Sequence, residues 1–268
     1  MFRTTICLGA VVLFLLTGCT DSLEYSPNVT SDRNTPKNLN AVNLDRLRAV
    51  PGDDTVRFVL SGDTQRGYDE AKDFVKLANA IPGLDFVLLA GDISDFGLVQ
   101  ETEWITGIYA DLKVPYLGVI GNHDMAAKGR EVFRYVFGEP DYSFIYQGYK
   151  FVCLNTNSRE VAFDGTIPDL RWLDQQMRPQ AGVRGFLAVS HVAPFSGDFD
   201  PNMEAGYVAA LERSGNCLAS LHAHDHNPGQ YSPYPNGIPF IVSGAILKRA
   251  FTLIEIVDGS LHAREIEY

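Results

Sequence analysis

Short apolar runs alternate with amphipathic stretches in the part of the chain that follows residue 54. The runs cover 56–60, 85–90 and 115–120, and helix-like apolar spacing occupies 68–80 and 98–112. Strands that are apolar along most of their length are buried on both faces of a sheet. The pattern therefore predicts an α/β fold in which helices cover the sheet.

Later segments depart from this alternation and predict hairpins. One hairpin spans 142–154 around Gln147-Gly148, and a strictly alternating pair of runs spans 251–266 around Asp258-Gly259, a dipeptide typical of tight hairpin turns. Further strands are predicted at 185–190, 217–221 and 240–243, and one helix is predicted at 168–177. We expect two packed mixed β-sheets flanked by helices rather than one open sheet.

The first residues have the layout of a bacterial secretion signal. Arg3 precedes an apolar run at 6–16 that is too short to span a bilayer. The following Leu16-Thr17-Gly18-Cys19 resembles a lipobox, whose cysteine becomes the lipid-modified first residue of the mature protein. The resemblance implies a lipoprotein held in the bacterial cell envelope through Cys19, facing the periplasm or the surface. An ordinary cleaved signal and a buried N-terminal helix are the alternatives.

The chain divides into a signal at 1–19, a tether at 20–54 and one folded domain at 55–268. The tether is rich in Asn, Ser, Thr, Asp and Pro, and has room for one short helix; a poorly ordered N-terminus is the simpler interpretation. Cys153 and Cys217 lie in apolar runs of the domain, and we expect unpaired, buried thiols, although an oxidising periplasm allows a disulfide.

Net charge limits the class of substrate. Asp and Glu number 33 against 22 Lys and Arg, which gives a formal net charge of -11. Such a chain is not expected to bind an extended nucleic-acid backbone. A small anionic substrate stays possible, because bound cations offset the carboxylates that hold them.

Polar side chains follow the predicted strands directly, at the carboxyl edge where α/β proteins form their clefts. These residues are Asp63, Asp92, Asn122 and His191. Five of the 6 histidines lie in strand-end segments, namely His123, His191, His222, His224 and His226. In an extended segment, the alternate spacing of 222–226 places the imidazoles on one side. Taken singly, each residue is more often a cap or turn residue, but together they predict a metal site.

Mixed carboxylate, amide and imidazole ligands suit divalent first-row metals such as Mn, Fe or Zn. A carboxylate can bridge two such ions. A pair of ions stabilises the attacking and leaving oxygens of an in-line displacement and yields a bridging hydroxide as nucleophile near neutral pH. This chemistry is phosphoester hydrolysis.

Five ordered motifs resemble those of the calcineurin-like metallophosphoesterases. They are Asp63-Thr64-Gln65, Gly91-Asp92-Ile93-Ser94-Asp95, Gly121-Asn122-His123-Asp124, His191, and Ala223-His224-Asp225-His226. The resemblance spans about 56–226, and it implies a four-layer α/β/β/α sandwich with two divalent or mixed-valence metal ions.

The resemblance also implies a role for each position. Asp92 bridges both ions; Asp63, Gln65 and His226 belong to one metal site, and Asn122, His191 and His224 to the other. His123 does not bind metal but lies near the scissile phosphate, where it stabilises charge or protonates the leaving alkoxide.

Asp95 is the expected orienting partner of His123. Asp124 is expected to hydrogen-bond its own loop. His222 has no counterpart in the motif, and we expect it to pack or to support another residue. The rim bases Arg66, Lys128, Arg130 and Arg159 are expected to be solvated, with Arg66 the nearest candidate for a phosphate contact.

Two positions depart from the family pattern. Gln65 replaces a metal-ligating histidine; its amide oxygen can coordinate, but more weakly or with preference for a harder ion. Ala223 replaces a glycine and requires an ordinary backbone conformation.

The leading hypothesis is therefore a hydrolase of small phosphomonoesters or phosphodiesters, with cyclic nucleotides among the candidates. The alternative is a catalytically weakened surface lipoprotein that uses the fold as a binding or scaffolding module, and Gln65 is its main support. The sequence leaves the natural substrate, the metals and the oligomeric state open.

Overall fold

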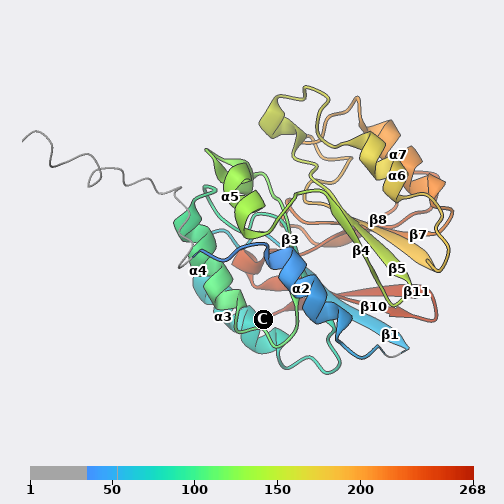
Figure 1. The fold of residues 1–268 in the computed structure, drawn as a ribbon. Coiled ribbons are helices and arrows are strands. Elements are labelled where there is room, and N and C mark those ends of the chain that lie inside the picture. The colour runs from blue at the N-terminus through green and yellow to red at the C-terminus, as the bar shows by residue number, and fades with distance from the viewer. Residues whose placement is uncertain (1–34, 53) are drawn as a thin grey trace, which may run out of the picture.

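The computed structural model describes residues 35–52 and 54–268 (Figure 1). The predicted secretion signal, the lipidation site Cys19 and part of the predicted tether lie outside the described residues, so these stay predictions. Among the residues described, no helix combines the length and the apolar character needed to cross a membrane.

One mixed sheet carries the first three predicted strands. Its strand order is β11-β10-β1-β2-β3, with β1, β2 and β3 parallel and β10 antiparallel to both β1 and β11. The strands are β1 (Thr55–Ser61), β2 (Phe86–Ala90), β3 (Tyr116–Val119), β10 (Ala250–Val257) and β11 (Ser260–Glu267). Each of the three parallel strands ends directly before a polar segment predicted for the site.

The other mixed sheet has the order β4-β5-β6-β7-β9-β8, with antiparallel strands at both edges. The strands are β4 (Tyr142–Tyr146), β5 (Tyr149–Cys153), β6 (Gly185–Val189), β7 (Cys217–His222), β8 (Gly229–Tyr231) and β9 (Phe240–Val242). Both predicted hairpins are confirmed. Gln147, Gly148, Asp258 and Gly259 have positive φ, as the tight turns that join twisted antiparallel strands require.

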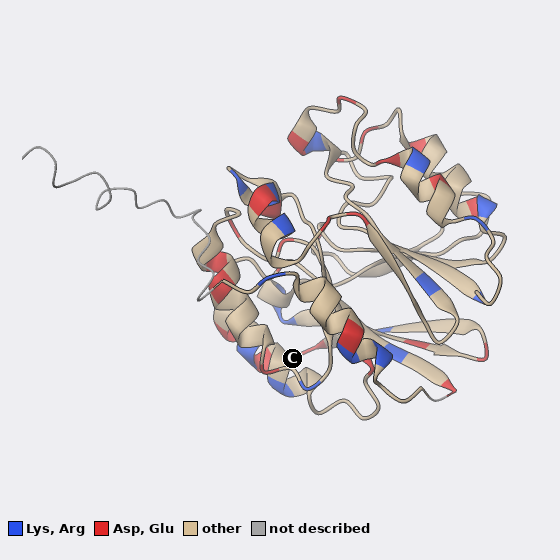
Figure 2. Ribbon diagram, viewed as in Figure 1, with Lys and Arg blue, Asp and Glu red and all other residues tan. Residues whose placement is uncertain are grey.

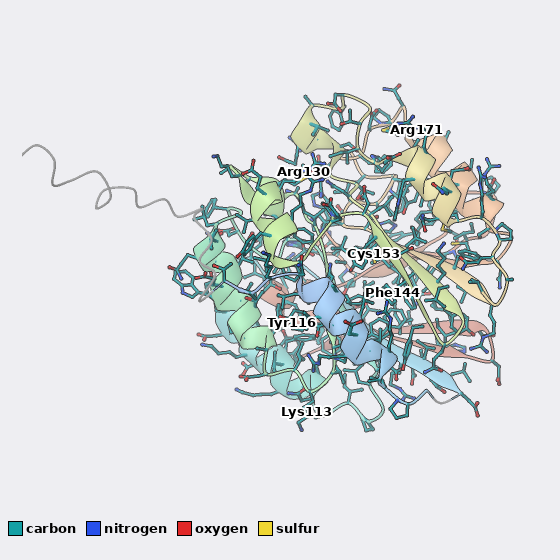
Figure 3. All side chains as sticks on the ribbon, viewed as in Figure 1. Lys113, Tyr116, Arg130, Phe144, Cys153 and Arg171 are labelled. Carbon is teal, nitrogen blue, oxygen red and sulfur yellow. The ribbon has the colours of Figure 1, made fainter. Side chains whose placement is uncertain are left out.

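The predicted four-layer sandwich is confirmed (Figure 1). Between the sheets, Phe58 of β1, Phe86 of β2 and Phe151 of β5 form interlocking ring contacts with centroids 5.0 to 5.4 Å apart. Phe144 and Cys153, both labelled in Figure 3, are buried in the same core. Both described cysteines are free, as expected; Cys153 is buried, whereas Cys217 is only partly buried.

Helices cover the two outer faces. Buried side chains of α3 (Tyr68–Ala78), α4 (Val99–Tyr109) and α5 (Gly129–Val136) pack on the first sheet, and those of α6 (Leu170–Gln176) and α7 (Glu204–Arg213) pack on the other. Short 3₁₀ turns are η1 (His123–Met125), η2 (Ser158–Val161) and η3 (Ile246–Lys248). Charged residues lie mainly on the helices and loops, and the strands are largely uncharged (Figure 2).

The short helix expected within the predicted tether at 20–54 is present as α2 (Leu39–Arg48). This helix packs on the domain and buries Leu47 in the core between the sheets. Its Asn40 side chain donates to the Gly118 carbonyl at 2.9 Å and accepts from the Gly118 amide at 2.7 Å. Asn40 thus satisfies backbone groups of the edge strand β3, as a neighbouring strand would.

Candidate metal centre

The six ligands predicted by motif order come together where the two sheets meet. Three follow β1, β2 and β3 of one sheet, and three follow β6 and β7 of the other. They are Asp63, Asp92, Asn122, His191, His224 and His226. Because parallel strands present their carboxyl ends at one edge, the packed sheets bring residues more than 160 positions apart into contact, as in the 3.1 Å hydrogen bond from the His224 amide to Asp63 Oδ2.

His191 lies at the middle of the group and is completely buried. Its Nδ1 donates to the Ala90 carbonyl at 2.7 Å. This bond leaves Nε2 to face the site, 3.0 Å from Asn122 Oδ1 and 3.3 Å from Asp92 Oδ1. A main-chain acceptor on one ring nitrogen is a common way to hold the other nitrogen ready for a metal.

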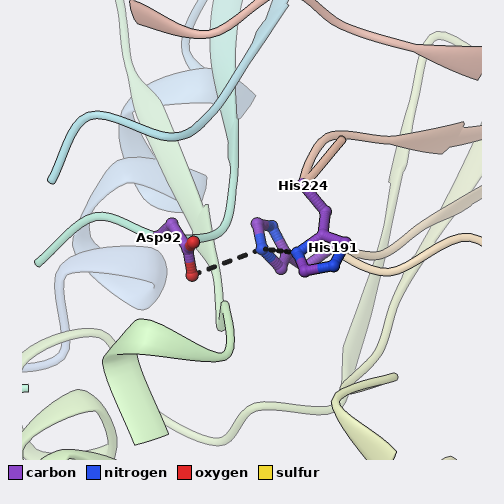
Figure 4. Close-up of side chains that lie close together, drawn as sticks. All are labelled: Asp92, His191 and His224. Carbon is purple, nitrogen blue, oxygen red and sulfur yellow. Dashed lines mark hydrogen bonds and ion pairs between the residues drawn. The ribbon is translucent and has the colours of Figure 1, made fainter. Parts of the chain in front are cut away.

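His224 approaches from the β7 end, with Nδ1 3.2 Å from His191 Nε2 (Figure 4). One donor atom each from Asp92, His191 and His224 lie within 4.8 Å of one another. Burial opposes charge on both partners of the Asp92–His191 pair, but their attraction prevails, lowering the pKa of Asp92 and raising that of His191. A cation that takes the place of the His191 proton would meet an ionised carboxylate and neutral imidazoles.

The other half of the site is formed by Asp63, Gln65 and His226. His226 Nε2 lies 3.1 Å from Asp63 Oδ1, and this carboxylate raises the pKa of His226 above its usual value. Asp63 Oδ1 is buried without a hydrogen bond of regular geometry. Gln65 is close by, with Nε2 3.4 Å from Asp92 Oδ2. A buried, under-satisfied carboxylate oxygen beside imidazole and amide groups fits a cation.

Two glycines make room for the site. A Cβ on Gly121 would lie 2.0 Å from the Asp92 amide nitrogen, and one on Gly91 would lie 2.4 Å from His191 Nδ1. Gly91 also has φ +97, which side chains rarely allow. The glycines before Asp92 and Asn122 in the motifs are therefore required by close approach. Ala223, which stands where the family pattern has glycine, is not among the residues with positive φ. It therefore has the ordinary backbone conformation that was expected.

The backbone of the site is strained in a consistent way. Asp63, Gln65, Asp92, His224 and His226 all have φ between 44° and 72°. Non-glycine residues rarely take this left-handed conformation, which concentrates at functional sites where surrounding contacts impose it.

His123 stands at the open side of the site. Its side chain is 39% exposed, and its Nε2 lies 4.0 Å from Asp92 Oδ2. Its main-chain amide donates to Asp92 Oδ1 at 2.9 Å. The predicted partner Asp95 contacts His123, but through its main chain: His123 Nδ1 donates to the Asp95 carbonyl at 2.8 Å. The Asp95 carboxylate Oδ1 is 3.6 Å from the same nitrogen. The main chain of Asp95 therefore orients this ring.

Asp124 hydrogen-bonds its surroundings, as expected. It accepts from the amides of Ile93, Ser94 and Gly121 and from the Ser94 hydroxyl. These bonds join the loop after β3 to the loop after β2. Asp124 thus fixes the segments that carry Asn122 and Asp92.

His222 has a packing role and does not face the donor group. Its ring stacks on Phe240 with planes 2° apart, and Nδ1 lies 3.1 Å from the Ser190 hydroxyl. Burial lowers its pKa to about 3, so the ring is neutral.

The sequence did not single out Asp198. Its Oδ2 lies 3.0 Å from His224 Nε2, and its Oδ1 lies 2.6 Å from Nη1 of Arg159, which was expected to be merely solvated. Of the other rim bases, Lys128 and Arg130 are exposed, and Arg66 Nη1 is 3.4 Å from Asp95 Oδ2. Asp198 follows no strand directly, so strand-end reasoning could not find it.

A four-layer sandwich with carboxylate, amide and imidazole donors at its strand ends is the architecture that the sequence resemblance implied, that of the metallophosphoesterases. The chain belongs to the calcineurin-like phosphoesterase family, whose family model matches residues 56–228. This family is metal-dependent, and the donor group fits that chemistry.

Curated relatives match part of the chain. A protein of Fibrobacter succinogenes named as a probable cyclic nucleotide phosphodiesterase is 30% identical over 116 residues, which is 40% of this chain and 43% of that protein. A protein of Synechococcus sp. with the same description is 32% identical over 100 residues, covering 35% of this chain and 37% of that protein. The matches thus span less than half of either relative.

Solved structures share the fold at low sequence identity. A dimetal phosphatase from Danio rerio has a TM-score of 0.63 at 15% identity, covering 79% of this chain and 97% of that one. GAP50, an anchor in the inner membrane complex of Plasmodium, has a TM-score of 0.59 at 13% identity, covering 80% and 84%. These likenesses support the fold alone.

Proposed function

We propose that this protein is a metal-dependent phosphoesterase that hydrolyses small phosphodiesters, with cyclic nucleotides as the first candidates. The observation that carries the proposal is the convergence of six residues with oxygen and nitrogen donors from both sheets, three of which have donor atoms within 4.8 Å of one another, beside one partly exposed histidine, His123. Bound divalent ions supply Lewis-acid charge and an acidified water at such a site.

Protein residues would hold the metal and assist the leaving group. Asp92 is buried and is reached by His191, His123 and Gln65, so its carboxylate would help to hold the bound metal. His123 is exposed enough to meet substrate and is oriented through Nδ1, so its Nε2 is available to stabilise or protonate a leaving oxygen. Asp63, Asp92 and His191 are buried, whereas Asn122, His224 and His226 are partly exposed.

The preference for diesters rests on the partial relatives, which are named as probable cyclic nucleotide phosphodiesterases. The net charge of -11 also supports a small substrate over a nucleic-acid backbone.

The test compares the purified full chain with Asp92→Asn and His123→Ala after metal removal and reloading with Mn²⁺, Zn²⁺ or Fe²⁺. Substrates are bis-p-nitrophenyl phosphate, p-nitrophenyl phosphate and 3′,5′- and 2′,3′-cyclic nucleotides. We expect Asp92→Asn to lose metal and activity, and His123→Ala to keep metal but lose at least about 100-fold in kcat. His262→Ala, an exposed histidine on β11, is the control. Full activity of both site variants would overturn the proposal.

We further propose that the two metal positions are unequal. The side with Asn122, His191 and His224 has two imidazoles, whereas the side with Asp63 and His226 has Gln65 where the family pattern has histidine. Competitive titration with a chromophoric chelator should show one tight and one weaker ion, and Gln65→His should raise the weaker affinity about tenfold or more. Equal affinities in the original chain would contradict this asymmetry.

The scaffolding alternative predicts a different outcome of the same experiments. A binding module that has lost its chemistry would bind no second metal and hydrolyse none of the substrates, even after Gln65→His. The likeness to a Plasmodium anchor protein concerns the fold alone. The retained donor group favours the enzyme.

We propose that a lipid on Cys19 anchors the protein in the cell envelope, on the strength of the lipobox-like Leu16-Thr17-Gly18-Cys19. Expression in a bacterial host with radiolabelled palmitate should label the full chain, and Cys19→Ser should abolish the label while Cys7→Ser keeps it. Equal labelling of the chain and Cys19→Ser would contradict the anchor.

A further inference from the structure

His224 is held by a side chain at the ring nitrogen that faces away from the donor group. Nδ1 faces His191, and Nε2 lies 3.0 Å from Asp198 Oδ2. A carboxylate accepts hydrogen bonds only, so Nε2 carries the proton and Nδ1 has its lone pair directed to the site. His191 obtains the same result from a main-chain carbonyl, that of Ala90.

The other oxygen of Asp198 is also engaged. Oδ1 lies 2.6 Å from Arg159 Nη1, so the carboxylate is held from two sides and cannot rotate freely without losing one partner. The Asp198 amide additionally donates to the Ser196 hydroxyl at 3.4 Å. The contact with Arg159 therefore helps to orient the carboxylate in addition to its contact with His224.

The contact crosses three neighbouring strands. Arg159 lies in η2 after β5, Asp198 in the loop after β6, and His224 in the segment after β7, and these strands are adjacent in the six-stranded sheet. His224 also has φ 72, a conformation that its own segment does not favour. A long-range hydrogen bond is thus a source of order for a ligand on a strained loop.

We propose that Asp198 is a positioning residue for the metal centre: it accepts the Nε2 proton of His224 and fixes Nδ1 toward the cation, while Arg159 holds the carboxylate. The inference rests on the proposed metal-dependent function. Acceptors of this kind orient a histidine ligand and raise its basicity, and their loss lowers metal affinity about 10–100-fold.

The chain offers a matched control. The side chain of Asp174 is 27% exposed, as is that of Asp198, and it pairs with Arg178 and Arg213 far from any predicted ligand in the sequence. Asp174→Ala therefore removes an equally exposed ion-paired carboxylate without touching His224. Any general effect of losing such a carboxylate appears in both variants.

The experiment is a Co²⁺ titration of the metal-free full chain, followed by visible absorption, for the original chain, Asp198→Ala, Asp198→Asn, Arg159→Ala and Asp174→Ala. We expect Asp198→Ala to weaken the tighter Co²⁺ site about 10–100-fold and alter its spectrum. Asp198→Asn keeps an acceptor oxygen and should restore part of the affinity; Arg159→Ala should lose less than Asp198→Ala, and Asp174→Ala should match the original chain. Urea unfolding of the metal-free variants checks the fold.

Unchanged Co²⁺ affinity and spectrum in both Asp198 variants would overturn the positioning role and leave the proposed function standing. A comparable loss in Asp174→Ala would also overturn it, because the effect would then be general. Absence of Co²⁺ binding by the original chain would overturn the proposed function together with this inference. If Asp198→Ala does not fold, Asp198→Asn and Arg159→Ala carry the test together, because each is expected to lose part of the Co²⁺ affinity, and unchanged affinity in both would overturn the positioning role.

Discussion

Replacement of Gly121 by alanine tests whether close approach of two strand-end loops sets the geometry of Asp92. An added Cβ would lie 2.0 Å from the Asp92 amide nitrogen and 2.2 Å from Asp92 Oδ1. Non-bonded heavy atoms rest comfortably at about 3.5 Å, so the loops must separate by roughly 1.5 Å. Ligand constellations tolerate errors of only about 0.5 Å. Gly121→Ala should therefore lose metal affinity by at least about tenfold.

The same substitution should also destabilise the metal-free protein. Overpacking of a tight interior site costs about 1–3 kcal/mol, and here the atoms that must move include backbone. Gly107 in α4 is the control, because a Cβ there meets nothing within 4 Å. Gly107→Ala should raise the unfolding free energy by about 0.5–1 kcal/mol, since alanine loses less backbone entropy in a helix.

The assay is urea unfolding of the metal-free full chain, monitored by tryptophan fluorescence, together with metal content after reloading and gel filtration. Two signatures are expected from Gly121→Ala, a lower unfolding midpoint and substoichiometric metal. An unfolding midpoint and a metal content equal to those of the original chain, in a preparation where Gly107→Ala shows its gain, would refute the steric argument.

Two further predictions concern the buried thiol of Cys153 and the helix α2. Burial raises the pKa of Cys153 to about 12, so about one thiol in a thousand is ionised at pH 9. Iodoacetamide should therefore label Cys153 only after denaturation, as measured by peptide mass mapping. Rapid labelling of the native protein would contradict the burial of this thiol. Asn40→Ala should lower the unfolding free energy by about 1–3 kcal/mol, because it leaves the Gly118 amide unpaired and the Gly118 carbonyl with the Tyr142 hydroxyl as its remaining donor. Val42→Ala, on the exposed side of α2, should change it little, and equal effects would contradict the anchoring role of Asn40.

Much of the fold and site was predictable because it obeys local rules. Apolar runs marked the buried strands, and the polar residue after each run marked the carboxyl edge. Asp63, Asp92 and Asn122 needed no knowledge of long-range contacts, since parallel pairing brings successive strand ends together. The position of His191 and the 222–226 segment followed from the same rule applied to the second sheet.

The supports of these ligands could not be predicted in this way. Asn40 lies in a polar segment whose composition is typical of a linker, and only its contact with Gly118 shows that α2 completes the edge of β3. The role of Asp198 depends on how the loop after β6 returns past His224. Neither contact leaves a periodic or positional signature in the sequence, because each joins residues whose separation is set by loop paths.

The positive φ values at the site explain why metal affinity depends on the hydrogen bonds between its loops. Five donor positions adopt a conformation that ordinary residues disfavour by about 1–3 kcal/mol each. Local sequence cannot maintain such a backbone, so bonds between loops must do so. The bonds that Asp124 accepts at Ile93, Ser94 and Gly121 and the bond from the His224 amide to Asp63 have this function. Loss of one of these contacts should therefore release several ligands at once, and metal affinity should fall more steeply than global stability.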